Sequence, residues 1–202
     1  MVDSTISDST ATRGGGIYLA STSELTAINS TFSQNDASLT GDAISNYGTG
    51  AVSLFSSTVA RNGLPSTNTS ETLQNLTSGR FVLRNSLVVD NRSIADTSGT
   101  FISHGFNVIG NARSAVGLLT MSYLRDQVGG QSLAPVLWGA VGQLSHQGGR
   151  TRSVMPVATS PAIDRGSSYG RRTTDQRGAD RFLDGPDLGS LSDTQKIGRA
   201  HV

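Results

Sequence analysis

Short runs of alternating apolar and polar residues recur along the first half of the chain. Four segments of six residues align without gaps at spacings of 26, 27 and 29 residues, at positions 4–9, 30–35, 57–62 and 86–91. The third position of each segment is apolar, at Ile6, Phe32, Val59 and Val88. A second apolar column precedes the last three segments, at Leu25, Val52 and Phe81. Because alternate residues of a strand face the same side, each column predicts one buried stack in a coil of short strands.

The length of the repeat selects among repeat architectures. Leucine-rich repeats need several leucines and a fixed asparagine, propeller blades need about 40 residues, and helical repeats need about 33 or more. The composition also disfavours long helices, since the chain holds 29 Ser, 21 Thr and 24 Gly but only two Glu and one Lys. We therefore predict an all-β fold, a parallel β-helix of about four to five coils over residues 1–111. An irregular C-terminal capping module over residues 112–195 is expected to close it, with Trp138 over the last coil.

An asparagine column ends three of the four repeated segments, at Asn35, Asn62 and Asn91. Asparagine tolerates the left-handed backbone of a sharp corner, and stacked side-chain amides satisfy one another in a ladder. We predict a structural ladder at these positions, and a row of ligand-binding amides is the alternative.

Residues 63–80 interrupt the repeat with a segment that contains Pro65 and several Ser, Thr and Asn residues. Insertions in solenoids emerge on one face, which is often the binding face. This loop is therefore a candidate contact surface.

Motifs in the second half of the chain resemble a known C-terminal module. They are Q-G-G-R-T at positions 147–151, S-P-A-I-D-R-G at 160–166 and T-D-Q-R-G at 174–178. In this order they are similar to the choice-of-anchor Q domain of bacterial surface proteins. The resemblance implies that the upstream β-helix is right-handed and related to polymorphic outer-membrane protein repeats. It also implies secretion and attachment to the cell surface.

The two ends of the chain suggest a fragment. The sequence at residues 196–202 resembles the translation of a sequencing adapter, so we expect it to be an artefact. No signal peptide precedes the repeats. We expect the signal peptide and the anchor to lie outside this chain.

Charge and composition limit the possible chemistry. The chain has no cysteine, so disulfides and thiolate metal sites are excluded. Its net charge of +1 gives no reason to expect a nucleic-acid partner, and no apolar run approaches the ~18 residues of a transmembrane helix.

Two groups of charged residues deserve a chemical interpretation. An acidic stretch holds weak candidate metal ligands at Asp180, Asp184 and Asp187, whose oxygens suit calcium; otherwise no cofactor is expected. On adjacent coils, Arg61 and Asp90 are either the remnant of a lyase site or an exposed ion pair. No catalytic constellation of His, Ser and Asp is legible.

The leading functional hypothesis is a non-catalytic, secreted or cell-surface β-helix protein that acts in adhesion or surface display. Outward columns of Ser, Thr and Asn are expected to meet glycans or other molecules of a host or cell surface. One alternative is a polysaccharide-active enzyme similar to pectate lyases. The other alternative is a pure structural scaffold.

Overall fold

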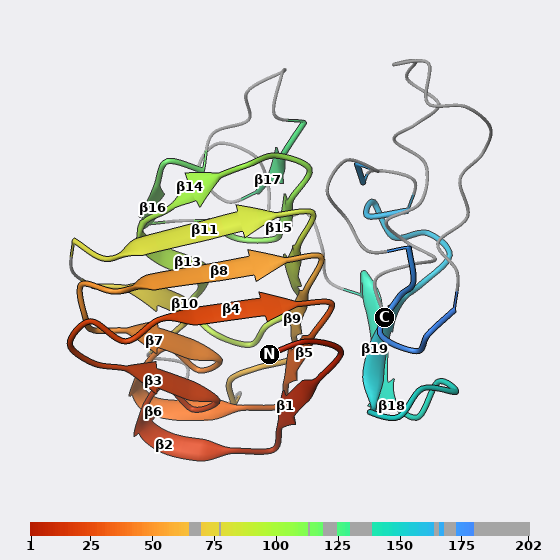
Figure 1. The fold of residues 1–202 in the computed structure, drawn as a ribbon, viewed down its shortest axis with the longest axis horizontal. Helices are drawn as coiled ribbons and strands as arrows, with labels where there is room; N and C mark the ends of the chain where they lie inside the picture. The colour runs from red at the N-terminus through yellow and green to blue at the C-terminus, as the bar shows by residue number, and fades with distance from the viewer. Residues whose placement is uncertain are drawn as a thin grey trace.

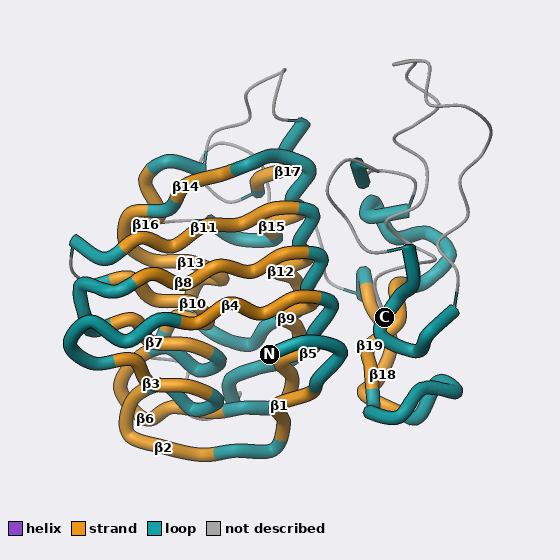
Figure 2. The backbone as a smooth tube through the Cα atoms, viewed as in Figure 1, coloured by secondary structure: helices purple, strands orange, loops and turns teal. Residues whose placement is uncertain are grey.

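The computed structural model describes residues 1–64, 70–76, 78–112, 114–118, 125–129, 139–163, 166–167 and 173–179. Within these ranges the protein is all-β, with nineteen strands and no helix (Figure 2). The described part of the chain accordingly has no helical segment that is long and apolar enough to span a bilayer.

Three parallel sheets form the walls of a β-solenoid. The four-strand sheet contains β4 (Leu25–Ile28), β8 (Ala51–Phe55), β11 (Arg80–Arg84) and β14 (Ile102–Ser103). The six-strand sheet contains β1 (Thr5–Ser7), β5 (Thr31–Ser33), β9 (Thr58–Ala60), β12 (Leu87–Val89), β15 (Val108–Ile109) and β17 (Gln127–Val128). The five-strand sheet contains β3 (Ile17–Leu19), β7 (Ile44–Asn46), β10 (Glu71–Asn75), β13 (Ala95–Thr100) and β16 (Ser114–Val116).

The chain visits the three sheets in turn, which confirms the predicted parallel β-helix. Figure 1 shows β4, β8 and β11 stacked across the front while the coil climbs in a right-handed sense from β1 to β14. Three full turns, β4-β5-β7, β8-β9-β10 and β11-β12-β13, are flanked by an incomplete turn before and a turn of very short strands after. The regular coil is thus shorter than the four to five coils expected.

The predicted apolar stacks form the core. Phe32 is in register with Ile6 and Val59, and Val59 with Val88. Val52 is in register with Leu25 and Phe81 on the four-strand sheet. Both columns belong to one buried cluster, so a repeat of ~27 residues places large side chains over one another at every turn.

A short parallel pair lies at one corner of the solenoid. It consists of β2 (Thr10–Arg13) and β6 (Asp36–Thr40), which stand between the six-strand and five-strand sheets along the chain. The residues of β2 are all exposed, and β2 is the lowest strand of the stack in Figure 1.

The described residues of 139–179 in the C-terminal module pack beside the solenoid, whereas a cap over its last coil was expected. Its antiparallel hairpin of β18 (Val141–Ser145) and β19 (Ser153–Pro156) stands along the six-strand sheet (Figure 1). A second apolar cluster joins the outward side chains of that sheet to the module: Ala60, Leu87, Val89 and Val108 with Ala140, Val141, Val154 and Ala162. The expected boundary at residue 111 precedes β16 and β17, which still add to the solenoid sheets. Trp138 lies outside the described residues.

Candidate functional site

Two columns of left-handed residues flank the six-strand sheet. All ten have φ between 47° and 61° and none is glycine: Asp3, Asn29, Ser56, Asn85, Phe106 and Arg125 before the strands, and Asp8, Gln34, Arg61 and Asp90 after them. A left-handed residue turns the chain sharply but is costly for side chains other than Gly, Asn and Asp. The repeated strain is tolerated because the same corner is stacked and hydrogen-bonded at every turn.

The asparagine ladder follows the second column. Asn35 Nδ2 donates to Asn62 Oδ1 over 3.0 Å, and Asn62 Nδ2 donates to Asn91 Oδ1 over 2.9 Å. The backbone amides of Asn35 and Asn62 donate to the same two oxygens. All three side chains are buried, so they satisfy the backbone of the corner and do not face a ligand.

A serine ladder follows the first column. The backbone amides of Ser4, Ser30 and Ser57 each donate to the hydroxyl of the serine one turn on, and the ladder continues through Ser86 to Asn107. The sequence aligned these serines but did not predict their role. A further amide pair, Asn46 to Asn75 over 3.0 Å, lines the five-strand sheet. These serine and asparagine side chains are mostly buried, so they do not form the outward rows of Ser, Thr and Asn that were expected to meet glycans.

Both corner ladders end on a buried carboxylate in the last turns. Asn91 Nδ2 donates to Asp96 Oδ1 over 2.7 Å, and the amide of Asn107 donates to Asp126 Oδ1 over 2.8 Å. A carboxylate only accepts, so it can receive the last donors of a ladder that has no further asparagine. Burial raises the pKa of Asp96 to about 7 and also raises the pKa of Asp126, against the opposing effect of these hydrogen bonds.

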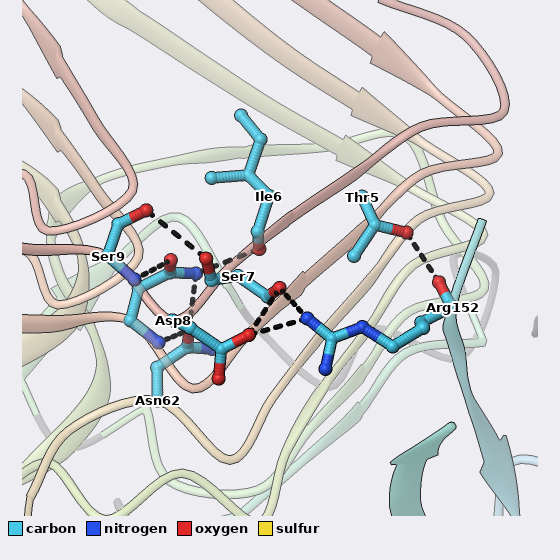
Figure 3. Close-up of polar contacts among 8 residues, drawn as sticks. Thr5, Ile6, Ser7, Asp8, Ser9, Asn62 and Arg152 are labelled. Carbon is cyan, nitrogen blue, oxygen red and sulfur yellow. Dashed lines mark hydrogen bonds and ion pairs between the residues drawn. The ribbon is translucent and has the colours of Figure 1, made fainter. Parts of the chain in front are cut away.

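The hairpin is fixed to the solenoid at the second left-handed column. Figure 3 shows Arg152 beside Asp8, with its guanidinium 2.6 Å from the carboxylate and 2.8 Å from Ser7 Oγ. The hydroxyl of Thr5 in β1 donates to the backbone carbonyl of Arg152. The ion pair is half-exposed, so it positions the hairpin more than it stabilises it.

Arg61 and Asp90 also bind the hairpin. The Arg61 guanidinium donates to the carbonyl oxygens of Val141 and Gly142 over 2.8 and 2.6 Å. The Asp90 carboxylate accepts the amides of Gly139 and Val141 over 2.8 and 3.1 Å. Neither described ion pair, Arg152–Asp8 or Arg177–Asp175, joins Arg61 to Asp90, so the expected exposed pair is replaced by two backbone clamps.

The T-D-Q-R-G motif holds the first turns. Gln176 is buried, and its Nε2 donates to the carbonyl oxygen of Ser4 and the hydroxyls of Thr5 and Thr151, while its Oε1 accepts from Thr31 over 2.7 Å. Asp175 shapes the motif by accepting the amides of Arg177 and Ala179 and the Arg177 guanidinium.

The other motifs act in the same docking. A Cβ on Gly149, in Q-G-G-R-T, would lie 2.7 Å from the Cα of Arg177, so only glycine fits there. In S-P-A-I-D-R-G, the carbonyl of Pro161 accepts from Gln127 of β17 over 3.0 Å. We call the described part of residues 139–179 the clasp, because it is bonded to strands from β1 to β17.

The candidate metal ligands Asp180, Asp184 and Asp187 lie outside the described residues. Across the described ranges no group of three or more His, Asp or Glu side chains is placed to hold a metal ion. Asp175, the described acid of this stretch, binds Arg177 and backbone amides.

The insertion at residues 63–80 is described except for residues 65–69 and Thr77. The hydroxyls of Ser70 and Ser93 both donate to the buried carboxylate of Asp42 over 2.5 Å, and burial raises the pKa of Asp42. The described contacts of this segment therefore tie it to the solenoid wall.

An exposed aromatic group lies at the corner formed by β2, β3 and β7. Tyr18 and Tyr47 are 43% and 47% exposed, with ring centroids 6.0 Å apart and planes tilted by 32°. The guanidinium carbon of Arg13, at the end of β2, lies 5.6 Å from the centroid of the Tyr47 ring. We call these three residues the tyrosine ledge. Sequence reasoning missed it, although the two tyrosines are 29 positions apart, close to one repeat.

No protein-family model matches the chain, and the searches of curated proteins and of solved structures found no match either.

Proposed function

We propose that this chain is part of a secreted or cell-surface β-solenoid that acts in adhesion, and that the tyrosine ledge is its contact surface. The solenoid supplies a wall of stacked strands, and the ledge lies on its surface at the corner formed by β2, β3 and β7. Secretion and bacterial surface attachment follow from the resemblance of the C-terminal motifs to surface-protein modules.

The observation that most directly supports adhesion is the exposure of the Tyr18–Tyr47 pair, with the Arg13 guanidinium beside the Tyr47 ring. Exposed aromatic residues together with arginine are the side chains that contribute most to recognition at protein surfaces. The serine and asparagine columns do not offer a comparable surface, because they are buried and occupied by backbone amides.

One form of the enzyme alternative places the active site at Arg61 and Asp90, and the other places it upstream of this chain. Both side chains bind the backbone of the clasp, which gives them a positioning role. This observation favours adhesion over a lyase that uses these two residues.

Adhesion is testable with beads that carry the purified chain. We expect them to be retained on surfaces coated with complex glycans, and we expect retention to fall after periodate has cleaved the vicinal diols of the coat. Beads carrying the double variant Tyr18→Ala/Tyr47→Ala should not be retained. Equal retention of wild-type beads on oxidised and intact coats would overturn adhesion to glycans, and antibody staining confined to permeabilised native cells would overturn surface display.

A further inference from the structure

The residues paired with Arg13 and Tyr18 on the neighbouring strands indicate which kind of ligand the tyrosine ledge can bind. Arg13 is the register partner of Thr40 in β6, and Tyr18 is the register partner of Ser45 in β7. The Thr40 and Ser45 hydroxyl oxygens lie 3.4 Å apart. The ledge therefore joins apolar ring surface directly to a small polar group.

Gln74 completes this polar group. It is in register with Ser45 in β10, and its Oε1 accepts hydrogen bonds from both Thr40 and Ser45. Gln74 is only 5% exposed. The amide nitrogen of Gln74 carries two N–H groups, which can donate to an acceptor from outside the chain.

The charge of the ledge also favours a ligand that accepts hydrogen bonds. Arg13 has no carboxylate partner within the described ranges. Asp42, which follows β6, is buried and already accepts from Ser70, Ser93 and the amide of Ala37. The ledge thus presents a guanidinium and an amide donor beside two rings, with no described acid to neutralise them.

We propose that the tyrosine ledge binds a carboxylated polysaccharide, an inference that rests on the adhesive function proposed above. A sugar ring has an apolar C–H face, which suits the exposed tyrosine rings, and a polar edge that needs donors. A carboxylate only accepts hydrogen bonds and matches the planar fork of Arg13, and the Gln74 amide lies on the same side. A partner that is only apolar would leave both of these donors unsatisfied.

Dextran and its derivatives test the ligand class on one polysaccharide backbone. We expect carboxymethyl-dextran to bind the chain in calorimetric titrations and unmodified dextran to bind at least about tenfold more weakly. Arg13→Ala, Tyr18→Ala and Tyr47→Ala should each weaken binding of carboxymethyl-dextran by about tenfold, whereas Tyr18→Phe should keep most of it. Arg80→Ala removes an exposed arginine from the four-strand sheet and should leave the affinity unchanged.

Each other result has a definite meaning. Equal binding of dextran and carboxymethyl-dextran, lost in the tyrosine variants, would overturn the carboxylate but leave adhesion through the ledge intact. Tighter binding of dextran sulfate than of carboxymethyl-dextran would assign the anionic group to a sulfate and overturn the carboxylate. Binding that the ledge variants leave unchanged would overturn the site. No binding to any dextran would overturn the ligand class, while the bead assay tests adhesion separately.

Discussion

At the scale of single residues, Asp96 combines two roles that oppose each other. Its carboxylate accepts the last amide of the asparagine ladder and the backbone amide of Asn111, both over 2.7 Å. Full burial disfavours its charge, and the pKa rises from 3.8 to about 7. Because the native pKa is raised, the group contributes stability that is fully present below about pH 4 and is lost as the pH rises through about 7.

Asp96→Asn should therefore flatten the pH dependence of folding. We expect the wild-type free energy of unfolding, measured by urea denaturation, to fall between about pH 4 and pH 7 by a few kcal/mol more than that of the variant, since each pKa unit corresponds to about 1.4 kcal/mol. Glu24→Gln neutralises an exposed acid and should leave the wild-type curve unchanged. Parallel curves for wild type and Asp96→Asn would contradict a raised pKa.

At the scale of elements, the ladders explain how strands of only three residues stay in register. Each turn of the asparagine ladder satisfies the amide of the previous corner as well as its side chain. Asn62 sits in the middle and donates in addition to the carbonyl oxygen of Phe32. Removing it leaves several buried groups without partners.

Asn62→Ala is accordingly expected to lower the free energy of unfolding by about 2–4 kcal/mol, because buried donors and acceptors on two neighbouring turns lose their partner. Thermal and urea unfolding followed by circular dichroism measures this change. Thr26→Ala alters an exposed position of β4 and should change stability by less than about 0.5 kcal/mol. A loss as small as that of Thr26→Ala would show that the ladder is dispensable.

The sequence predicted the elements whose signal repeats along the chain. The stacks through Phe32 and Val52 were predictable because every turn places an apolar residue at the same step. The carboxylates of Asp96 and Asp126 were not predictable, since each occurs once, where a ladder ends. The clasp was recognised only as a set of motifs, because its partners in the solenoid lie up to 172 positions away in the chain.

At the scale of the whole molecule, contacts between residues far apart in the sequence hold the clasp against the solenoid. Gln176 binds the first turns, Arg61 and Asp90 bind β18 in the middle, and Gln127 of β17 binds Pro161. An apolar cluster lies between these polar contacts. We infer that solenoid and clasp unfold together.

Calorimetry should show a single unfolding transition for the wild-type chain. The double variant Arg61→Ala/Gln176→Ala removes the clamps at two levels, so the clasp should separate first, with faster amide exchange in β18 and β19 than in β8 and β9. Arg80→Ala, on another sheet, should keep the single transition. If the double variant also unfolds in one step with unchanged exchange, the clasp does not depend on these side chains.

The clasp also restricts the number of turns that the solenoid can have between β1 and β17. Repeat proteins commonly gain or lose units by duplication, because each unit contacts only its neighbours. Here Gln176 of the clasp bonds Thr5 of β1, while Pro161, only 15 positions earlier in the chain, bonds Gln127 of β17. A turn added between β1 and β17 would move one of these two contacts apart by about 4.8 Å. The number of turns between β1 and β17 is therefore expected to change in evolution only together with the length of the clasp.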